Sequence, residues 1–190
     1  MTVMTTSIPG RPFTVDDLEA MPDDGHRYEL LDGVLLVSPA PGRRHQRVCG
    51  QLFIKLEQAC PGGMEVLFAP FAVQTSKSTE LQPDVLVARE SDLTEQNLPA
   101  APLLAVEILS PSTALFDLNT KRAAYERMRA PSYWVVDPDQ LVLTAFELDE
   151  NGRYQQVAEV KGTEEFRAER PFPVRIVPAE LLKGPRRRDL

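Results

Sequence analysis

The chain has 190 residues, of which 43% are hydrophobic, and this is sufficient for a single domain with a sizeable core. Its formal net charge of -7 argues against a protein that binds nucleic acid through an overall positive charge. Binding to nucleic acid would instead need local basic patches, a metal ion or a suitable arrangement of subunits in an oligomer. Two cysteines, Cys49 and Cys60, are too few for a disulfide framework and lack zinc-ligand spacing, and no apolar run approaches the ~18 residues of a membrane span.

The charge and hydropathy pattern predicts one domain over residues 12–183. Residues 1–11 are expected to form a loose N-terminus without an apolar leader segment, and residues 184–190 a basic C-terminal tail. Within the tail, Arg186-Arg187-Arg188 is either a solvent-exposed end, which we favour, or a segment that binds DNA. These features predict a soluble cytoplasmic protein with no membrane association.

The first predicted elements are a short helix and a hairpin. Thr14 precedes the helix of residues 15–21 as its N-cap, and Pro22 ends it. Residues 27–31 and 34–37 are apolar runs joined by Asp32-Gly33, which is the strongest short signal for a hairpin turn. Glu29 lies within the first of these strands, where an exposed position is one of its two interpretations.

A longer amphipathic helix is predicted over residues 44–59, with Pro61-Gly62-Gly63 as its stop. Its start carries a basic cluster, Arg43, Arg44, His45 and Arg47. These side chains, together with the helix dipole, would favour a phosphate, so Arg44, His45 and Arg47 are candidates for substrate binding. The alternative, which we favour, is a solvated basic face. His45 and His26 are not expected to be metal ligands, because no second histidine or cysteine stands at ligand spacing.

Several strands follow. Residues 64–68 and 71–74 form either a strand pair or one bent strand broken at Pro70, and Pro83 introduces a short strand over residues 84–88 that opens on Asp84. Residues 103–109 make an apolar run of strand length in which Glu107 is the only polar residue. A buried carboxylate without a partner would cost several kcal/mol or more, so Glu107 needs a cation or a raised pKa.

A helix over about residues 115–129 can supply that cation. Hydroxyls in Ser110-Pro111-Ser112-Thr113 offer N-caps, and Leu118, Tyr125 and Met128 recur at helical spacing. Lys121 falls on the same face, so its stem should lie along apolar surface while its ammonium reaches the strand ends.

The remaining residues predict more strands. Residues 133–136 read as a strand apolar on both faces, residues 141–148 and 153–160 as a second hairpin, residues 166–177 as an edge strand, and residues 178–182 as a terminal turn. The order of elements predicts an α/β or α+β fold with a mixed sheet flanked by few helices.

Two carboxylates, Asp84 and Glu107, and one inward lysine, Lys121, suit a divalent metal. Mg2+ prefers one or two carboxylate oxygens and keeps water and substrate phosphate in its other positions. The lysine would orient a water or offset charge on the attacked phosphate, so the chemistry is phosphodiester hydrolysis. The alternative for the same residues is a buried salt bridge between Glu107 and Lys121 that serves only structure.

The order of these motifs resembles a known family. Pro83-Asp84 followed by Glu107 on the next buried strand resembles the PD-(D/E)XK restriction-endonuclease-like nucleases. More closely, residues 12–180 resemble the Uma-type endonuclease family, and the segments that carry this resemblance are Glu29-Leu30-Leu31-Asp32-Gly33, Glu107 to Ser112, Lys121-Arg122 with Tyr125, and Tyr133-Trp134-Val135-Val136-Asp137-Pro138.

The resemblance implies a restriction-endonuclease-like mixed central sheet with additional hairpins, and one or two Mg2+ or Mn2+ ions held by Asp84 and Glu107. It also implies that Glu29 joins the acidic cluster. PD-(D/E)XK enzymes usually place the lysine two residues after the acid, where this chain has Leu109, and the Uma-type pattern moves it to the following helix, where Lys121 stands.

We therefore predict a metal-dependent endonuclease with DNA as the expected substrate. Double-strand cutting by such small domains generally needs two active sites, so a homodimer is expected. The alternative is a catalytically inactive module for binding or assembly that keeps the nuclease fold, which the acidic net charge would suit.

Overall fold

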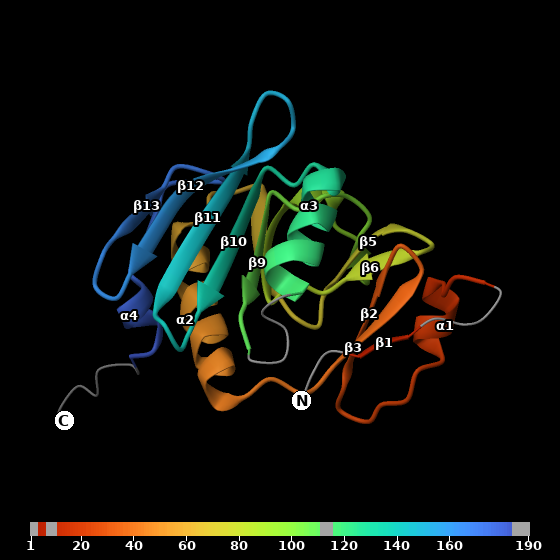
Figure 1. Cartoon of the computed structure of the whole chain (residues 1–190). Helices are drawn as coiled ribbons and strands as arrows, with labels where there is room; N and C mark the ends of the chain where they lie inside the picture. The colour runs from red at the N-terminus through yellow and green to blue at the C-terminus, as the bar shows by residue number, and fades with distance from the viewer. Residues whose placement is uncertain (1–3, 7–10, 111–115, 184–190) are drawn as a thin grey trace.

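Two six-stranded sheets and one two-stranded sheet form the framework of the protein, in a computed structural model that describes residues 4–6, 11–110 and 116–183 (Figure 1). The first sheet has the order β1 (Met4–Thr6), β3 (Val34–Ser38), β2 (Arg27–Leu31), β6 (Thr79–Leu81), β5 (Ala72–Ser76) and β8 (Asn97–Leu98). The second has the order β12 (Tyr154–Lys161), β11 (Val142–Leu148), β10 (Ser132–Asp137), β9 (Leu104–Ile108), β7 (Val85–Arg89) and β4 (Met64–Phe68). β13 (Phe166–Ala168) and β14 (Val174–Ile176) form the third.

The sheets are mixed, as expected for the α+β class. In the second sheet β9 and β10 run parallel, while β7 is antiparallel to both β9 and β4. The helices are α1 (Val15–Glu19), α2 (Arg43–Ala59), α3 (Arg122–Met128) and α4 (Pro178–Leu181), with a 3-10 turn at Glu90–Asp92 and a π-helical segment at Phe116–Lys121. No helix within the described ranges is long and apolar enough to cross a membrane.

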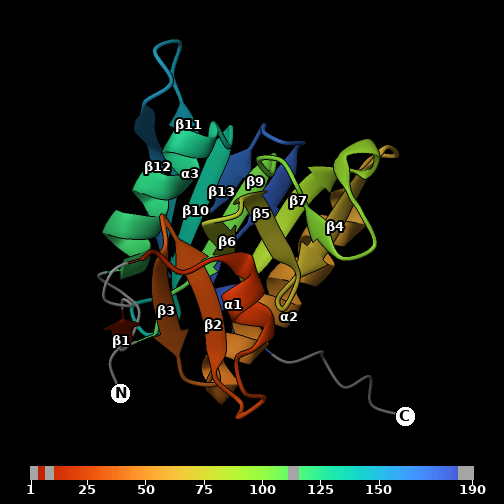
Figure 2. The same ribbon diagram turned by 90° about the vertical axis from the view of Figure 1, so that its right-hand side faces the viewer.

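The hairpin of β2 and β3 forms as the Asp-Gly dipeptide predicts. Asp32 and Gly33 both adopt positive φ angles, 51° and 79°, which a two-residue turn of this kind requires. A Cβ atom on Gly33 would lie 2.4 Å from the Cβ atom of Pro12, so the close approach of the N-terminal segment also needs glycine here. Figure 2 shows this hairpin beside α1 on one side of the molecule, with α2 and the second sheet behind it.

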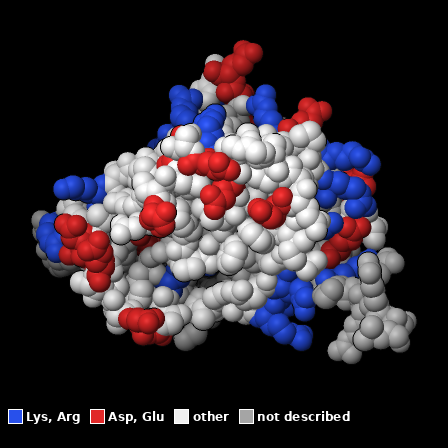
Figure 3. Space-filling model, turned by 180° about the vertical axis from the view of Figure 1, so that it is seen from behind, with Lys and Arg blue, Asp and Glu red and all other residues white. Residues whose placement is uncertain are grey.

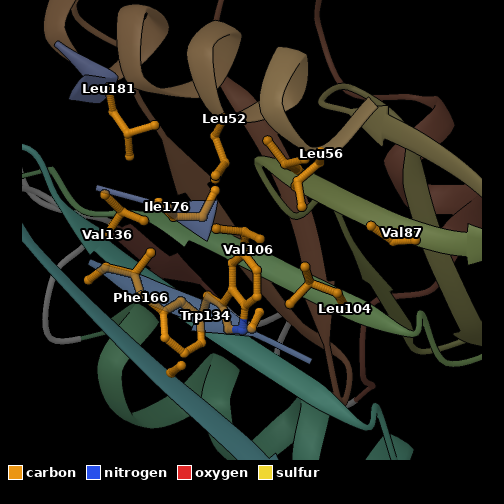
Figure 4. Packing of buried hydrophobic residues seen from close by; sticks show 14 of the residues in the cluster. Leu52, Leu56, Val87, Leu104, Val106, Trp134, Val136, Phe166, Ile176 and Leu181 are labelled. Atoms are coloured by element: carbon orange, nitrogen blue, oxygen red, sulfur yellow. The ribbon is translucent and has the colours of Figure 1, made fainter. Parts of the chain in front are cut away.

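The second sheet is covered on both faces, α2 lying on one and α3 on the other (Figure 1). On β9, Val106 and Ile108 pack with Leu52 of α2, whereas Ala105 packs with Tyr125 of α3. Figure 4 shows the larger core on the α2 side; its labelled residues are Leu52, Leu56, Val87, Leu104, Val106, Trp134, Val136, Phe166, Ile176 and Leu181. Since side chains alternate along a strand, Glu107 shares the α3 face with Ala105.

Several elements differ from the sequence predictions. The strands of residues 64–68 and 72–76 are neither a pair nor one bent strand, because β4 belongs to the second sheet and β5 to the first. The segment predicted as one helix from residue 115 begins with the π-helical turn, and the proposed caps Ser112 and Thr113 lie outside the described residues. Residues 4–6, expected to be loose, pair with β3, and residues 166–177 hold two strands instead of one. The tail at 186–188 also lies outside the described residues.

Candidate active site

Asp84 and Glu107 lie next to the last residue pair of the antiparallel strands β7 and β9. β7 pairs with β9 so that Val85 lies opposite Val106; Asp84 directly precedes Val85 in the chain, and Glu107 directly follows Val106. Both acids are buried, 2% and 1% exposed, and both line one cavity of about 210 Å³. The two predicted metal ligands therefore lie in the same cavity.

Lys121 joins this cavity from the π-helical segment that precedes α3. Its Nζ atom lies 2.9 Å from Oε1 of Glu29 and 3.2 Å from Oε1 of Glu107, and only 4% of the residue is exposed. The hydroxyl of Tyr125 donates to the same oxygen of Glu107 at 3.3 Å. Burial and the charge of Glu107 raise the pKa of Tyr125, which keeps this hydroxyl a donor at neutral pH. Lys121 thus ties the first sheet to the second.

The burial of Glu29 settles an alternative that the sequence left open. Glu29 is 2% exposed, so it is not a solvent-facing strand residue, and its Oε1 atom also accepts a hydrogen bond from the backbone N–H of Gln82 at 2.8 Å. It lies in the same cavity as Asp84 and Glu107.

Asp84 is held by three donors. Arg27 Nη2 lies 2.8 Å from Oδ1, while Oδ2 accepts from the backbone N–H of Ile108 at 2.7 Å and lies 3.0 Å from Nε2 of His45. Burial by itself would raise the pKa of Asp84, but the His45 hydrogen bond and the charges of Arg27, His45 and Lys121 lower it below its ordinary value. Asp84 is therefore an ionised carboxylate at neutral pH, and an ionised carboxylate only accepts, so Nε2 of His45 carries a proton.

Arg27 also lines this cavity, and its sequence pattern did not predict that position. Its Nη1 atom donates to the carbonyl of Gln82 at 3.1 Å, and Gln82 in turn donates to Glu29. A lone arginine beside Tyr28 on a hairpin strand looks like an ordinary solvent-facing residue. The available signal was spacing: Arg27 and Glu29 are two residues apart on one strand and therefore share a face.

The basic cluster at the start of α2 is divided between two surroundings. His45 is 9% exposed and points to Asp84, and its Nδ1 atom has no hydrogen-bond partner among the described residues. Arg44 and Arg47 are exposed; Arg44 pairs with Asp139 at 3.0 Å, and both arginines line a separate surface pocket of about 400 Å³ with Arg43. Figure 3 shows basic side chains gathered where this end of α2 meets the surface. Arg44 and Arg47 are thus outside the acidic cavity.

The carboxylates of the cavity are the groups with which this protein could hold a divalent ion. Three carboxylates, from Glu29, Asp84 and Glu107, line it together with two permanent cations, from Arg27 and Lys121. Mg2+ and similar ions take one or two carboxylates and leave their other positions to water and phosphate. No three His, Cys, Asp or Glu residues of the described ranges form a ready metal cluster. The donor set therefore suits an ion held by two carboxylates.

Comparison with known proteins agrees with this architecture. The family model "Uma2: Putative restriction endonuclease" matches residues 15–180. The chain belongs to the Uma2 family. This confirms the family expected from the motifs. No curated protein matches the chain.

A solved structure has a fold similar to that of this chain. It is described as "a putative nuclease belonging to DUF820 from Anabaena variabilis", and it superposes with a TM-score of 0.71 over 90% of this chain and 98% of that one, at 14% identity. At this identity the likeness establishes the fold alone. The expected nuclease-like arrangement of mixed sheets and few helices is confirmed.

Proposed function

We propose that this protein is a Mg2+- or Mn2+-dependent endonuclease that hydrolyses phosphodiester bonds of DNA. The observation that carries the proposal is that Asp84 and Glu107 are both buried and line one cavity, which Lys121 also lines. Family membership supports the reaction class. Burying two acids side by side is costly, and binding of a doubly charged ion gives that cost a purpose.

Each residue has a distinct role in this proposal. Asp84 and Glu107 would hold one or two ions, and a bound ion supplies a water of lowered pKa and polarises the phosphate. Lys121 orients the attacking water and offsets the negative charge that develops on the phosphate. Glu29 positions Lys121, since it contacts the ammonium at 2.9 Å.

The charges of the cavity support a divalent ion with one phosphate. The three carboxylates and the two permanent cations that line the cavity carry a formal charge of -1 in sum. A divalent ion reverses the sign of this charge, and one phosphodiester then brings the site to neutrality. A buried site favours such balance because unpaired charge is costly at low dielectric.

The three residues predicted to bind substrate lie in two different places, so we give them different roles. Arg44 and Arg47 lie outside the cavity on the helical turn that also carries His45, and we assign them to backbone phosphates flanking the cleaved bond. His45 instead holds Asp84. We retain the homodimer as the form that cuts both strands, and the cytoplasm as the compartment.

Plasmid cleavage with Mn2+ tests the proposal. Asp84→Asn and Glu107→Gln keep the side-chain shapes but remove the carboxylate charges, and each should abolish cleavage while the circular dichroism spectrum stays unchanged. Glu65→Gln, on the exposed strand position of β4, is the matched control and should cleave like the wild type. If either cavity variant cleaved at the wild-type rate, the proposed active site would be refuted.

A catalytically inactive module is the second candidate. The observation that favours it is that all three carboxylates already contact cations, Asp84 through Arg27 and the two glutamates through Lys121. Thermal unfolding with and without Mn2+ separates the candidates. An ion at 100 times its Kd stabilises the protein by about 2.7 kcal/mol, whereas an inactive module gains nothing.

A further inference from the structure

Arg27 occupies an oxygen that the proposed metal would need. Its Nη2 atom lies 2.8 Å from Oδ1 of Asp84, and the Asp84 side chain is 3% exposed. The other oxygen, Oδ2, is already held by Ile108 and His45. Arg27 is therefore the permanent cation in direct contact with Asp84.

The position of Arg27 leaves it access to a second space. Its side chain is 18% exposed, and it lines both the acidic cavity and a second pocket of about 400 Å³ that includes Tyr28 and Gln82. The guanidinium thus stands at the boundary between the buried carboxylates and an open surface. Lys121 has no such freedom, because it is 4% exposed and bridges Glu29 and Glu107.

We propose that Arg27 is an internal counter-ion that neutralises Asp84 in the ion-free protein and binds the substrate phosphate once a divalent ion has taken over Asp84. This inference rests on the proposed nuclease function. A guanidinium suits both partners, since its planar fork matches carboxylate and phosphate alike. The exchange also keeps Asp84 paired at every stage, which a buried carboxylate requires.

In this proposal Arg27 and the metal ion compete for the carboxylate of Asp84. A fixed positive charge next to a divalent ion repels it, and at an effective dielectric of about 20 this repulsion is large enough to change the metal affinity by about tenfold or more. Arg27→Gln should therefore tighten Mn2+ binding by about tenfold. At saturating Mn2+, the same variant should bind a phosphorothioate DNA duplex about tenfold more weakly, because a charge-assisted hydrogen bond to phosphate is lost.

Two further variants keep the test decisive. Arg27→Lys retains the charge but not the fork, so its Kd for Mn2+ should stay within about threefold of the wild type while DNA binding weakens. Arg153→Gln removes an exposed arginine that pairs with Glu126 at 3.2 Å, away from the cavity, and should change neither constant. Isothermal titration measures Mn2+ binding and fluorescence anisotropy measures DNA binding.

The outcomes separate this inference from the proposed function. Wild-type protein that binds Mn2+, with Arg27→Gln binding it equally or more weakly, would show that Arg27 only positions Asp84. Absence of any Mn2+ binding by the wild type would overturn the nuclease proposal itself. If Arg27→Gln unfolds without metal, Mn2+ should refold it; failure to refold at concentrations that saturate the wild type also overturns the inference.

Discussion

Replacing Lys121 by methionine tests how strongly the buried charges depend on one another. Lys121 contacts Glu29 at 2.9 Å and Glu107 at 3.2 Å, and at an effective dielectric of about 20 each contact corresponds to roughly 5 kcal/mol of attraction. Most of this attraction offsets the cost of burying the three charged groups. Removing one partner of a buried ion pair leaves that cost uncompensated, so we expect Lys121→Met to lower the free energy of unfolding by about 3–5 kcal/mol at pH 8.

The pH dependence of this loss distinguishes charge from packing. Without the shared ammonium, two facing carboxylates are left together, and one of them is relieved of its charge when a proton binds. The deficit of Lys121→Met should therefore shrink as the pH falls from 8 to 5. A cavity or packing defect would not respond to protons.

Urea unfolding at both pH values measures the effect, with Lys55→Met as the matched control. Lys55 contacts Glu180 at 2.9 Å, but the two side chains are 24% and 33% exposed, so this pair should contribute no more than about 1 kcal/mol. Equal losses in the two variants, or a deficit in Lys121→Met that is the same at pH 8 and pH 5, would refute the reasoning.

Three more predictions follow from burial and charge. The lowered pKa of Asp84 stabilises the fold above the unfolded-state pKa of about 3.9 and ceases to do so as the pH falls, so Asp84→Asn should flatten the acid limb of stability against pH in urea titrations. Leu52→Ala, at a position 0% exposed, should cost about 2–5 kcal/mol in the same assay, against less than about 1 kcal/mol for Ile54→Ala at 45% exposure. Burial, with a smaller contribution from Asp84, raises the pKa of Cys49 to about 12, so a thiol reagent at pH 8 should label Cys60 well before Cys49, as peptide mass analysis would show.

The cavity was predictable where a polar residue interrupts an apolar pattern. Glu107 stands alone in an apolar strand, and burial at 1% exposure confirms that reading. Lys121 was placed on the apolar face by helical spacing, and it does reach Glu107. Such residues can be found because local periodicity fixes their face and the cost of an unpaired charge then demands a partner.

The rest of the site depends on contacts that no local pattern records. Arg27 meets Asp84 across 57 positions of sequence, through the packing of two separate sheets. The sequence analysis predicted one central mixed sheet, because the strands have similar apolar patterns. Only the observed pairing assigns β4 to one sheet and β5 to the other. His45 was grouped with arginines by its position at a helix start, yet the turn of α2 points it inward.

The charged residues of the site come from two different sheets, and this affects the stage of folding at which the site can form. Arg27 and Glu29 belong to β2, whereas Glu107 belongs to β9 and Asp84 directly precedes β7. Neither group can leave water alone without a large electrostatic penalty. Docking of the two sheets must therefore desolvate both groups together, and a chain that has folded only its N-terminal half holds an incomplete, hydrated set of charges.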